Sequence, residues 1–249
     1  MISVAMATYQ GMPYIVRQLD SIMIQLALDD EIVISDNGST DGTVEHLQSA
    51  AAKDQRIRLV FLSSPKGIIP NIQNALRLCR GEIIFLSDQD DIWKSGKVSI
   101  ISSFFDTDPN LLAVQGDAEL IGLDERVIFP SFFALRRCGP GIFKNFKKNT
   151  WQGCSMAFRH SLLDAALPFP KGIPMHDMWL GLLAELAGKV AFVPEVLISY
   201  RRHENNQSGM KPAEWCKIIR WRVCLACAVF GNIPKIINLK NEIRKKIRN

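Results

Sequence analysis

Residues 81–93 read Gly81-Glu-Ile-Ile-Phe-Leu-Ser-Asp-Gln-Asp-Asp-Ile-Trp93, and the organisation of the whole chain can be worked out from them. A short apolar strand is predicted over Ile83–Leu86, and it runs directly into three carboxylates. These are Asp88, Asp90 and Asp91. Such a cluster repels itself unless a positive charge shares the site, and it suits a hard divalent cation that also holds phosphates. A solvated acidic turn is the alternative, but ligands bind where parallel strands end, which favours a site.

The residues before this segment alternate between predicted strands and helices. Strands are expected over residues 2–7, 31–35, 57–62 and 83–86, and helices over 13–28, from Thr43 onward and over 71–79. This alternation with short links predicts an α/β fold with a parallel, doubly wound sheet. Polar residues follow the strands, and the carboxyl ends of parallel strands meet at one crevice, so we expect a nucleotide pocket there. No G-x-G-x-x-G or Walker A loop follows the first strand, which argues against a dinucleotide dehydrogenase or a P-loop enzyme.

Three segments of this half resemble the glycosyltransferases of family 2. The Asp-rich segment resembles their Asp-X-Asp motif, and Ala7-Thr8-Tyr9 resembles their first nucleotide-binding turn. Residues 35–42 resemble Asp-Asp-Gly-Ser-Thr-Asp-Gly, although Asn37 replaces the second Asp and Gln10 replaces a common Asn. The resemblance implies a GT-A fold, with a mostly parallel central sheet flanked by helices, and inverting transfer from a nucleotide sugar. The residues of these motifs are most similar to those of bacterial rhamnosyltransferase-like enzymes that build surface polysaccharides.

Two segments of the second half extend the resemblance. Met175-His176-Asp177-Met178-Trp179 is similar to the family segment that holds the general base, which implies that role for Asp177. From the residues alone, a carboxylate just before the predicted helix 180–187 is equally typical of a helix cap. Residues 200–209 resemble the Tyr-Arg-X-His-X-Asn-Asn segment of the family, with Glu204 where Gly is frequent. A solvated polar loop is the alternative for that segment.

The resemblance therefore implies a set of site residues. Asp177 would be the catalytic base, and Asp36 would bond the pyrimidine ring. The nucleotide sugar would contact Ala7, Thr8, Tyr9, Asp36, Asp88, Gln89, Asp90 and Arg202. The metal, Mg²⁺ or Mn²⁺, would be held by Asp90, Asp88 and His203. The acceptor side would include Trp151, Asp91 and Trp179, with Trp151 as a face on which a sugar stacks; an ordinary buried strand over 151–158 is the alternative.

The second half is less regular in sequence. A helix is expected over 97–105, and two strands around a turn over 111–117 and 118–124. Residues 131–148 are aromatic and basic and are expected to form a loop-rich acceptor segment or a plain surface loop. Residues 190–193 and 196–199 are expected to form a strand pair split by Pro194-Glu195.

The net charge of +5 is unevenly placed along the chain. Residues 211–249 carry ten Lys or Arg and two Glu, a net of +8, which leaves −3 for residues 1–210. Helices are expected over 213–230 and 233–247, and apolar residues such as Trp215 and Ile219 alternate with Lys217 and Arg220. This composition fits a helix lying on anionic lipid, or a helix packed on the core with a solvated basic face. No helix-turn-helix, zinc or RNP signature supports a nucleic-acid partner.

Cysteine usage and apolar runs bear on location. The single C-x-x-C pair, Cys224 and Cys227, lies in an apolar, helix-like stretch without a second pair, which does not favour a metal or redox site. Thiols, and Met1 leading directly into a strand without a signal peptide, favour the cytoplasm. No run reaches the roughly 18 apolar residues of a spanning helix. We therefore expect a cytoplasmic protein, with the tail as a candidate contact to the inner face of the membrane.

The sequence thus predicts a GT-A glycosyltransferase domain over residues 1–209 and a basic amphipathic tail over 210–249. Residues 1–95 form the nucleotide-binding half and 96–209 the acceptor half. The implied reaction moves a sugar, with rhamnose as the candidate, from a dTDP- or UDP-linked donor to a hydroxyl of a growing O-antigen or capsule glycan, whose acceptor is a candidate lipid-linked molecule.

Two other functions stay open at this point. A nucleotidylyltransferase acting on sugar phosphates would favour a Gly-rich loop bearing Arg or Lys after the first strand, and residues 7–13 have none. A non-catalytic sugar-nucleotide-binding module would not need both Asp177 and the Asp cluster.

Overall fold

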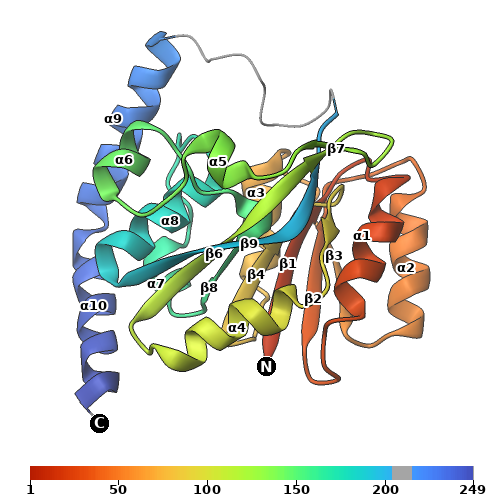
Figure 1. Cartoon of the computed structure of the whole chain (residues 1–249), viewed down its shortest axis with the longest axis horizontal. Helices are drawn as coiled ribbons and strands as arrows, with labels where there is room; N and C mark the ends of the chain where they lie inside the picture. The colour runs from red at the N-terminus through yellow and green to blue at the C-terminus, as the bar shows by residue number, and fades with distance from the viewer. Residues whose placement is uncertain (204–214, 249) are drawn as a thin grey trace.

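The computed structural model describes residues 1–203 and 215–248, so Glu204 and the rest of the segment up to Gly209 lie outside the described residues. The first half follows the predicted alternation of strands and helices (Figure 1). Its elements are β1 (Ile2–Thr8), α1 (Tyr14–Met23), β2 (Glu31–Asp36), α2 (Thr43–Lys53), β3 (Ile57–Phe61), α3 (Ile68–Leu76) and β4 (Ile83–Ser87). All four strands are parallel, in the order β3-β2-β1-β4. β2 and β4 are buried along their whole length, as expected of parallel strands covered on both faces.

The second half extends the same sheet with strands of both directions. Its elements are β5 (Ile92–Trp93), α4 (Lys97–Thr107), β6 (Leu111–Ile121), β7 (Val127–Phe129), α5 (Phe132–Arg136), α6 (Ile142–Lys147), a 3-10 turn (Gly153–Ser155), β8 (Met156–Arg159), α7 (Leu162–Ala166), α8 (His176–Ala187) and β9 (Lys189–Arg201). β8 is antiparallel to both β4 and β6, whereas β9 is parallel to β6. The result is one mixed sheet in the order β3-β2-β1-β4-β8-β6-β9-β5, with β7 paired to β6.

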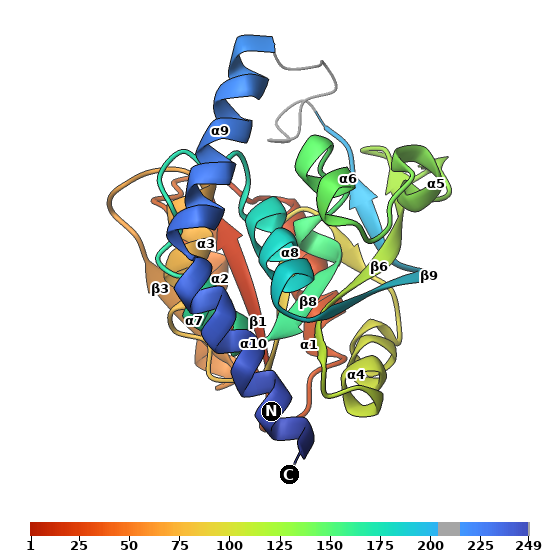
Figure 2. The ribbon, with the colours of Figure 1, turned by 90° about the vertical axis from the view of Figure 1, so that its left-hand side faces the viewer.

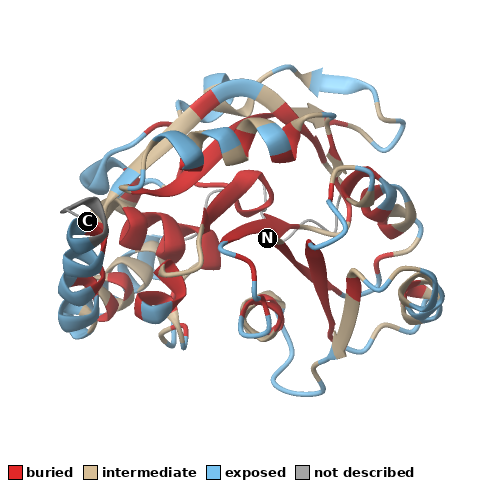
Figure 3. Cartoon of the chain, turned by 90° about the horizontal axis from the view of Figure 1, so that it is seen from below, coloured by how far each residue is buried: buried red, intermediate tan, exposed pale blue. Residues whose placement is uncertain are grey.

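The connection between β4 and β5 determines the shape of the sheet. β4 lies in the middle of the strand order and β5 lies at its edge, yet only the four residues Asp88–Asp91 separate them in sequence. The sheet must therefore curl until its far edge returns to the end of β4. Figure 3 shows the buried strands inside this curl, with exposed helix faces outside. The Asp-rich segment lies where the two halves of the sheet meet.

Four local expectations in the second half were wrong. Residues 111–121 form the single strand β6, and 189–201 form the single strand β9. The pairing register of these strands shifts between Gly116 and Asp117, opposite Pro194 and Glu195, which have no partner in β6. A bulge at this point accommodates the proline, which cannot donate a ladder hydrogen bond. Residues 131–148 contain α5 and α6, and the strand expected over 151–158 begins only at Met156 because the 3-10 turn precedes it.

Helices cover both faces of the sheet. One buried apolar cluster joins the sheet to α3, α7, α8 and α10 (Ile233–Arg248), and the other joins it to α1, α2 and α4. Figure 2 shows α10 running beside α7, with α9 (Trp215–Gly231) continuing beyond the body of the domain. Ile236, Leu239 and Ile243 of α10 are buried, so this helix is part of the core. Among the described residues no single helix is long and apolar enough to cross a membrane; α9 and α10 pass such a test only as a pair, bent by 58°.

The packing of α8 predicts that residue 181 must be glycine. A Cβ built on Gly181 would lie 2.4 Å from three ring atoms of Trp151. We expect Gly181→Ala to lower the free energy of unfolding by about 1–3 kcal/mol because the buried ring must shift. Gly231→Ala is the matched control, since nothing lies within 4 Å of its added carbon. Denaturant titration of both variants gives the comparison, and an equal effect of the two changes would contradict this account of the α8 packing.

Candidate active site

The end of β4 is tied to the end of β1 by side-chain amides. Gln89 accepts a hydrogen bond from the backbone N–H of Tyr9 (2.8 Å) and donates one to its carbonyl (2.9 Å). Gln18 of α1 donates to Ser87 Oγ (2.8 Å) and to the carbonyl of Asp88 (2.9 Å). The structure thus brings the first turn, residues 7–9, beside the Asp-rich segment. Of these residues Tyr9 is 52% exposed, whereas Ala7 and Thr8 are buried.

Asp36 has a different place from the one expected. It is fully buried, and its two oxygens accept hydrogen bonds from Thr8 Oγ1 (2.8 Å), Ser39 Oγ (2.6 Å) and the backbone N–H groups of Gly38 and Ser39. These contacts use the acceptor positions of a carboxylate. The expectation that Asp36 meets a pyrimidine ring is therefore corrected: its side chain holds the turn after β2 against β1.

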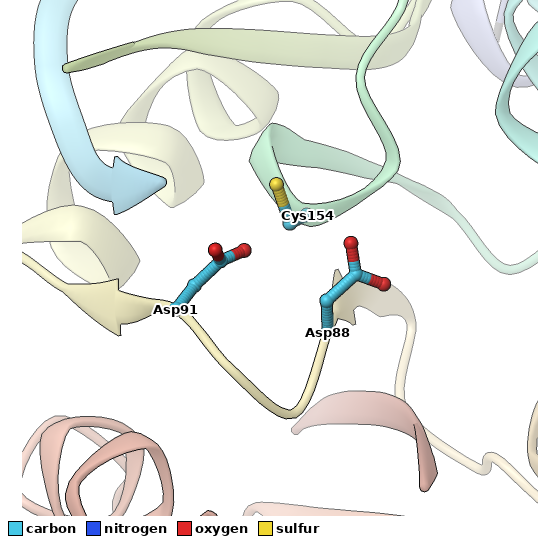
Figure 4. A group of neighbouring side chains, drawn as sticks. All are labelled: Asp88, Asp91 and Cys154. Carbon is cyan, nitrogen blue, oxygen red and sulfur yellow. The ribbon is translucent and has the colours of Figure 1, made fainter. Parts of the chain in front are cut away.

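Two carboxylates and a thiol converge at the Asp-rich segment. One ligand atom from each of Asp88, Asp91 and Cys154 lies within 4.8 Å of the others, and Figure 4 shows these side chains pointing toward one another. Burial raises the pKa of Asp88 to about 7, and the charges of Asp90 and Asp177 add to the effect. Burial and the charges of Asp90 and Asp88 also raise the pKa of Asp91 well above its usual range. This region favours the arrival of positive charge.

Asp91 lies beneath the site rather than on its acceptor side. Its side chain is 1% exposed, and among the described residues its Oδ2 atom has no hydrogen-bond partner. Its Oδ1 atom accepts a hydrogen bond from the backbone N–H of Arg201 (3.0 Å). A residue so enclosed does not contact an acceptor, which corrects that expectation.

Two buried cations that the sequence analysis did not select lie against these carboxylates. Lys97 of α4 is 1% exposed, donates to the carbonyl of Cys154 (2.7 Å) and lies 3.8 Å from the centre of the Trp93 ring. Burial lowers the pKa of Lys97 to about 7, while the negative charges of Cys154, Asp91 and Asp88 act in the opposite direction. Arg201 of β9 is 3% exposed and donates from Nε to the carbonyl of Asp90 (2.9 Å).

Sequence signals for both cations existed. Lys97 lies on the same face of its helix as the buried residues Val98, Ile101 and Phe105. A charged residue on an otherwise apolar helix face is the sequence signal that it is buried. Arg201 and Arg202 are neighbours in an extended segment, and successive side chains of a strand point to opposite faces. One of the two arginines therefore had to point inward, and the structure shows that it is Arg201.

Asp90 and His203, two residues that the resemblance implies as metal ligands, lie in direct contact. His203 Nε2 lies 2.6 Å from Asp90 Oδ2, and the His203 ring stacks on Tyr14 at 5.4 Å between centroids and 13° between planes. Arg202 donates to the hydroxyl of Tyr200 (3.3 Å) and is half-buried. The end of β9 therefore places Arg201 and His203 against the Asp-rich segment.

Asp177 lies in the first turn of α8 and is 7% exposed. Its oxygens accept hydrogen bonds from Asn149 Nδ2 (3.1 Å) and the backbone N–H of Gly153 (3.2 Å), and no side chain caps this helix. Burial raises the pKa of Asp177, and the neighbouring His176 opposes the rise. The charge of Asp177 also raises the pKa of Asp88, so the two carboxylates lie within electrostatic range of each other. A carboxylate held in this way, with its pKa raised toward neutrality, suits a general base.

The two tryptophans expected on the acceptor side belong to the core. Trp151 is 2% exposed, and its ring lies 4.8 Å from that of Phe192. Trp179 is fully buried and donates its indole N–H to the carbonyl of Ala166 (3.1 Å). Stacking on a sugar needs an open ring face, so both expectations are corrected. Trp151 instead packs against Gly181 of α8 and Phe192 of β9.

The donor atoms of the site fit a hard divalent cation. Asp90 and Asp88 supply carboxylate oxygens and His203 supplies a ring nitrogen, a set that Mg²⁺ and Mn²⁺ accept. Burial, together with the charges of Asp90 and Asp177, raises the pKa of Asp88, and Asp88, Asp91 and Cys154 form the group whose ligand atoms all lie within 4.8 Å of one another. The Asp-rich segment therefore offers the carboxylate oxygens that a divalent cation takes.

The curled mixed sheet, with helices on both faces and buried carboxylates at the strand ends, has the architecture of a GT-A glycosyltransferase. A family model described as "Glycosyl transferase family 2" matches residues 3–162, which is more than half of the chain. The chain therefore belongs to glycosyl transferase family 2, and it is a glycosyltransferase.

Relatives by sequence agree with this assignment. A putative teichuronic acid biosynthesis glycosyltransferase, TuaG of Bacillus subtilis, is 28% identical over 224 residues, which cover 85% of this chain and 82% of TuaG. Chondroitin synthase of Escherichia coli is 35% identical over 114 residues, which cover 46% of this chain but only 16% of that much longer protein.

Solved structures show the same fold. S. aureus TarS in complex with UDP-GlcNAc matches with a TM-score of 0.68 over 97% of this chain and 71% of that one, at 17% identity. The mannosyltransferase PcManGT from Pyrobaculum calidifontis, in complex with GDP-Man and Mn²⁺, matches with a TM-score of 0.63 at 20% identity, over 97% of this chain and 73% of that one. At these identities the likeness establishes the fold.

Arg201 is expected to stabilise the site against the repulsion of its carboxylates. Arg201→Met removes the guanidinium that bonds the Asp90 carbonyl and pairs with Glu125 (3.0 Å). Arg201 is 3% exposed and Glu125 is 31% exposed, so loss of the guanidinium and its hydrogen bonds should lower the free energy of unfolding by about 1–3 kcal/mol. The control is Arg126→Met, whose exposed pair with Asp124 should contribute less than about 1 kcal/mol. Denaturant titration at neutral pH measures both, and similar losses would show that Arg201 has no special role.

Proposed function

We propose that this enzyme transfers a sugar from a nucleotide diphosphate donor to a hydroxyl of a growing surface glycan, with inversion at the anomeric carbon and with help from a divalent metal. The observation that carries the proposal is that two groups of residues lie close together. His203 and Asp90 are in direct contact at the Asp-rich segment, and Asp177, a buried carboxylate with a raised pKa, lies close enough for its charge to raise the pKa of Asp88.

The donor end of the site would be built from the first half of the chain and the end of β9. Asp90, Asp88 and His203 would hold Mg²⁺ or Mn²⁺, which when bound neutralises charge on the diphosphate that leaves. Arg202 would add a cation, and residues 7–9 with Gln89 would form the floor of the nucleotide site. A UDP- or dTDP-linked sugar is proposed as donor. The UDP-GlcNAc bound to TarS and the Mn²⁺ bound to the mannosyltransferase support a nucleotide sugar and a divalent metal.

Asp177 would act as the general base. An acceptor hydroxyl is a poor nucleophile, and removal of its proton by a positioned carboxylate makes attack feasible. The oxygen of the hydroxyl forms the new bond to the anomeric carbon, the bond to the diphosphate breaks, and the proton moves to Asp177. Attack from the face opposite the leaving group inverts the configuration and needs no carboxylate nucleophile. Asn149 and the N–H of Gly153 keep the carboxylate oriented.

The acceptor is proposed to be a bacterial polysaccharide under construction. The names of two relatives, for teichuronic acid biosynthesis and for chondroitin synthesis, support polysaccharide assembly. Rhamnose as the sugar and O-antigen or capsule as the product rest on the motif resemblance alone.

We further propose that α9 rests on the anionic inner face of the cytoplasmic membrane, where a lipid-linked acceptor would be met. Four large apolar side chains of α9 are exposed: Trp215 by 80%, Phe230 by 71%, Ile219 by 59% and Val223 by 56%. Exposed apolar side chains of this kind, interleaved with Lys217 and Arg220, are typical of a helix at a bilayer interface. α10 contributes less to this surface, because its Ile236, Leu239 and Ile243 are buried while Ile233 and Ile237 are exposed.

The proposed reaction is tested by incubating the protein with a panel of UDP-, dTDP- and GDP-linked sugars and measuring nucleotide release. We expect release with at least one donor in Mn²⁺ or Mg²⁺, and its loss in a chelator. Asp90→Ala should abolish metal-dependent binding of the nucleotide diphosphate, measured by calorimetry. Equal binding by wild type and variant, with and without metal, would contradict the metal site.

The base is tested in the same assay with Asp177→Asn, which keeps the size of the side chain and removes its basicity. Turnover should fall by roughly 10²–10⁴ while donor binding is retained. Asp164→Asn, an exposed change in α7, is the control. Near-normal turnover of Asp177→Asn would limit Asp177 to a structural role in the loop that holds Asn149.

Membrane association is tested by sedimentation with anionic and neutral vesicles. We expect wild type to bind anionic vesicles at low salt and to dissociate as salt rises, because each basic residue near the surface contributes about 1 kcal/mol and is screened by ions. Trp215→Ser/Ile219→Ser/Val223→Ser should abolish binding, whereas Leu123→Ser/Ile128→Ser, exposed apolar residues beside β7, should not. Wild type that ignores anionic vesicles at low salt would refute the role of α9.

A further inference from the structure

One stretch of the acceptor half contains cations and no carboxylates. Residues 126–163 carry seven Lys or Arg and no Asp or Glu. The two at its ends are paired, Arg126 with Asp124 and Arg159 with Glu82. The five between them are exposed, and none has a carboxylate within ion-pair distance among the described residues. These five, Arg136, Arg137, Lys144, Lys147 and Lys148, are called the basic patch below.

The basic patch is gathered around one turn. Lys144 Nζ lies 3.0 Å from the position that a Cβ on Gly139 would take, so the ammonium group covers the bare backbone of that glycine. Burial raises the pKa of the nearby Cys138 thiol to about 11, and Arg136, Lys144 and Lys148 all act against the rise. Arg136, Lys144 and Lys148, from α5, α6 and the residue after α6, therefore all lie within electrostatic range of this one side chain, as does Asp117. Such a concentration of like charge is retained where a negatively charged ligand offsets it.

The basic patch is held firmly beside the proposed base. Asn145 of α6 donates to Glu185 of α8 (2.6 Å), and the backbone N–H of Gly141 bonds the same carboxylate (3.2 Å). Lys148 is followed directly by Asn149, whose side chain bonds Asp177. Figure 1 shows α5 and α6 away from α1 and α2, which flank the nucleotide half; α6 packs against α8, whereas α5 packs against β6. Lys148 of the basic patch is thus the direct neighbour in sequence of Asn149, the residue whose side chain orients Asp177.

Charge and position together indicate what the basic patch meets. A neutral sugar needs hydroxyl partners and not five exposed cations, whereas phosphate and carboxylate groups pair with Lys and Arg. The donor diphosphate would be held from the other side of Asp177 by Asp90 and His203. Phe143, 91% exposed in the middle of α6, offers an open aromatic face beside these cations, which suits a sugar ring.

We propose that the basic patch binds the phosphate or carboxylate groups of an anionic acceptor glycan, within a few sugar units of the hydroxyl that Asp177 deprotonates. This inference rests on the proposed function of the site, since it specifies the acceptor class of the same reaction. An anionic bilayer is the competing partner for a basic surface. The link from Lys148 through Asn149 to Asp177 favours the glycan, and α9 carries the larger exposed apolar surface.

Three probes test the proposal: an oligosaccharide containing hexuronate, its carboxyl-reduced neutral form, and a glycerol phosphate oligomer. Binding to wild type in the presence of Mn²⁺ and UDP is measured by fluorescence anisotropy at low and high salt. We expect one or both anionic probes to bind, with an affinity that falls as salt rises, and the neutral form to bind at least tenfold more weakly. The two anionic probes distinguish carboxylate from phosphate recognition.

The matched variants are Lys144→Gln/Lys147→Gln/Lys148→Gln and, as control, Lys53→Gln/Lys171→Gln/Lys240→Gln, which makes the same charge change at exposed sites elsewhere. Affinity for the anionic probe should fall about tenfold or more in the first and little in the second, because each exposed ion pair contributes up to roughly fivefold. Circular dichroism and Mn²⁺-dependent UDP binding should stay unchanged in both.

Three results would overturn the proposal. The first is equal affinity of the two triple variants for the anionic probe, and the second is equal binding of the anionic and neutral oligosaccharides to wild type. The third is a Lys144→Gln/Lys147→Gln/Lys148→Gln variant that no longer binds anionic vesicles but still binds both anionic probes. The last would assign the basic patch to a lipid surface. Failure of the proposed function would appear differently, as an absence of metal-dependent nucleotide release from any sugar donor while the anionic probe still binds the basic patch.

Discussion

The repulsion among the carboxylates at the end of β4 is the constraint on which this structure depends. Asp88, Asp90 and Asp91 cannot be gathered and enclosed without cations, and the first half of the sheet provides none at that point. Lys97 comes from α4, and Arg201 and His203 come from β9, so the second half must return to the end of β4. The curl of the sheet therefore also balances the charge of the site. The carboxylates of the first half and the cations of the second half are buried together.

The same arrangement explains where the two substrates would lie. The matched family model ends at residue 162, before Asp177, Arg201 and His203. The nucleotide half and the Asp-rich segment are thus the part that the family model describes, and Asp177, Arg201 and His203 come from beyond it. A common donor site combined with a separately built acceptor side lets one fold serve different glycans, since function depends on the site grafted onto the fold.

Sequence reasoning predicted the first half well because local patterns determine it. Buried parallel strands read as short apolar runs, and the turns after them are marked by Gly, Asn and Asp. In the second half, Gly116-Asp117 and Pro194-Glu195 look like strand ends, yet they lie opposite each other and form a bulge within two long strands. That pairing is non-local, so no window of sequence contains it.

Some positions of site residues could be predicted from local motifs, and others depend on burial in the folded structure. The meeting of Asp90 with His203 could be predicted because each lies in a recognisable motif. Burial could not be read from composition, and it moved Trp151, Trp179, Asp36 and Asp91 from contact roles to structural ones. It also made Lys97 important, since a charged residue in a helix is normally solvated and only its position on the apolar stripe marks it as enclosed.

The bulge between β6 and β9 has a consequence for how this part of the chain can change length over evolution. Successive residues of β9 point to opposite sides, so the count of residues from the bulge to the strand end decides whether Arg201 or Arg202 points inward. Insertion or deletion of a single residue there would exchange the two arginines and would also turn His203 away from Asp90. Changes of two residues, or a second compensating bulge, would preserve the arrangement. The acceptor half is therefore free to drift in sequence while the parity of this one strand stays fixed.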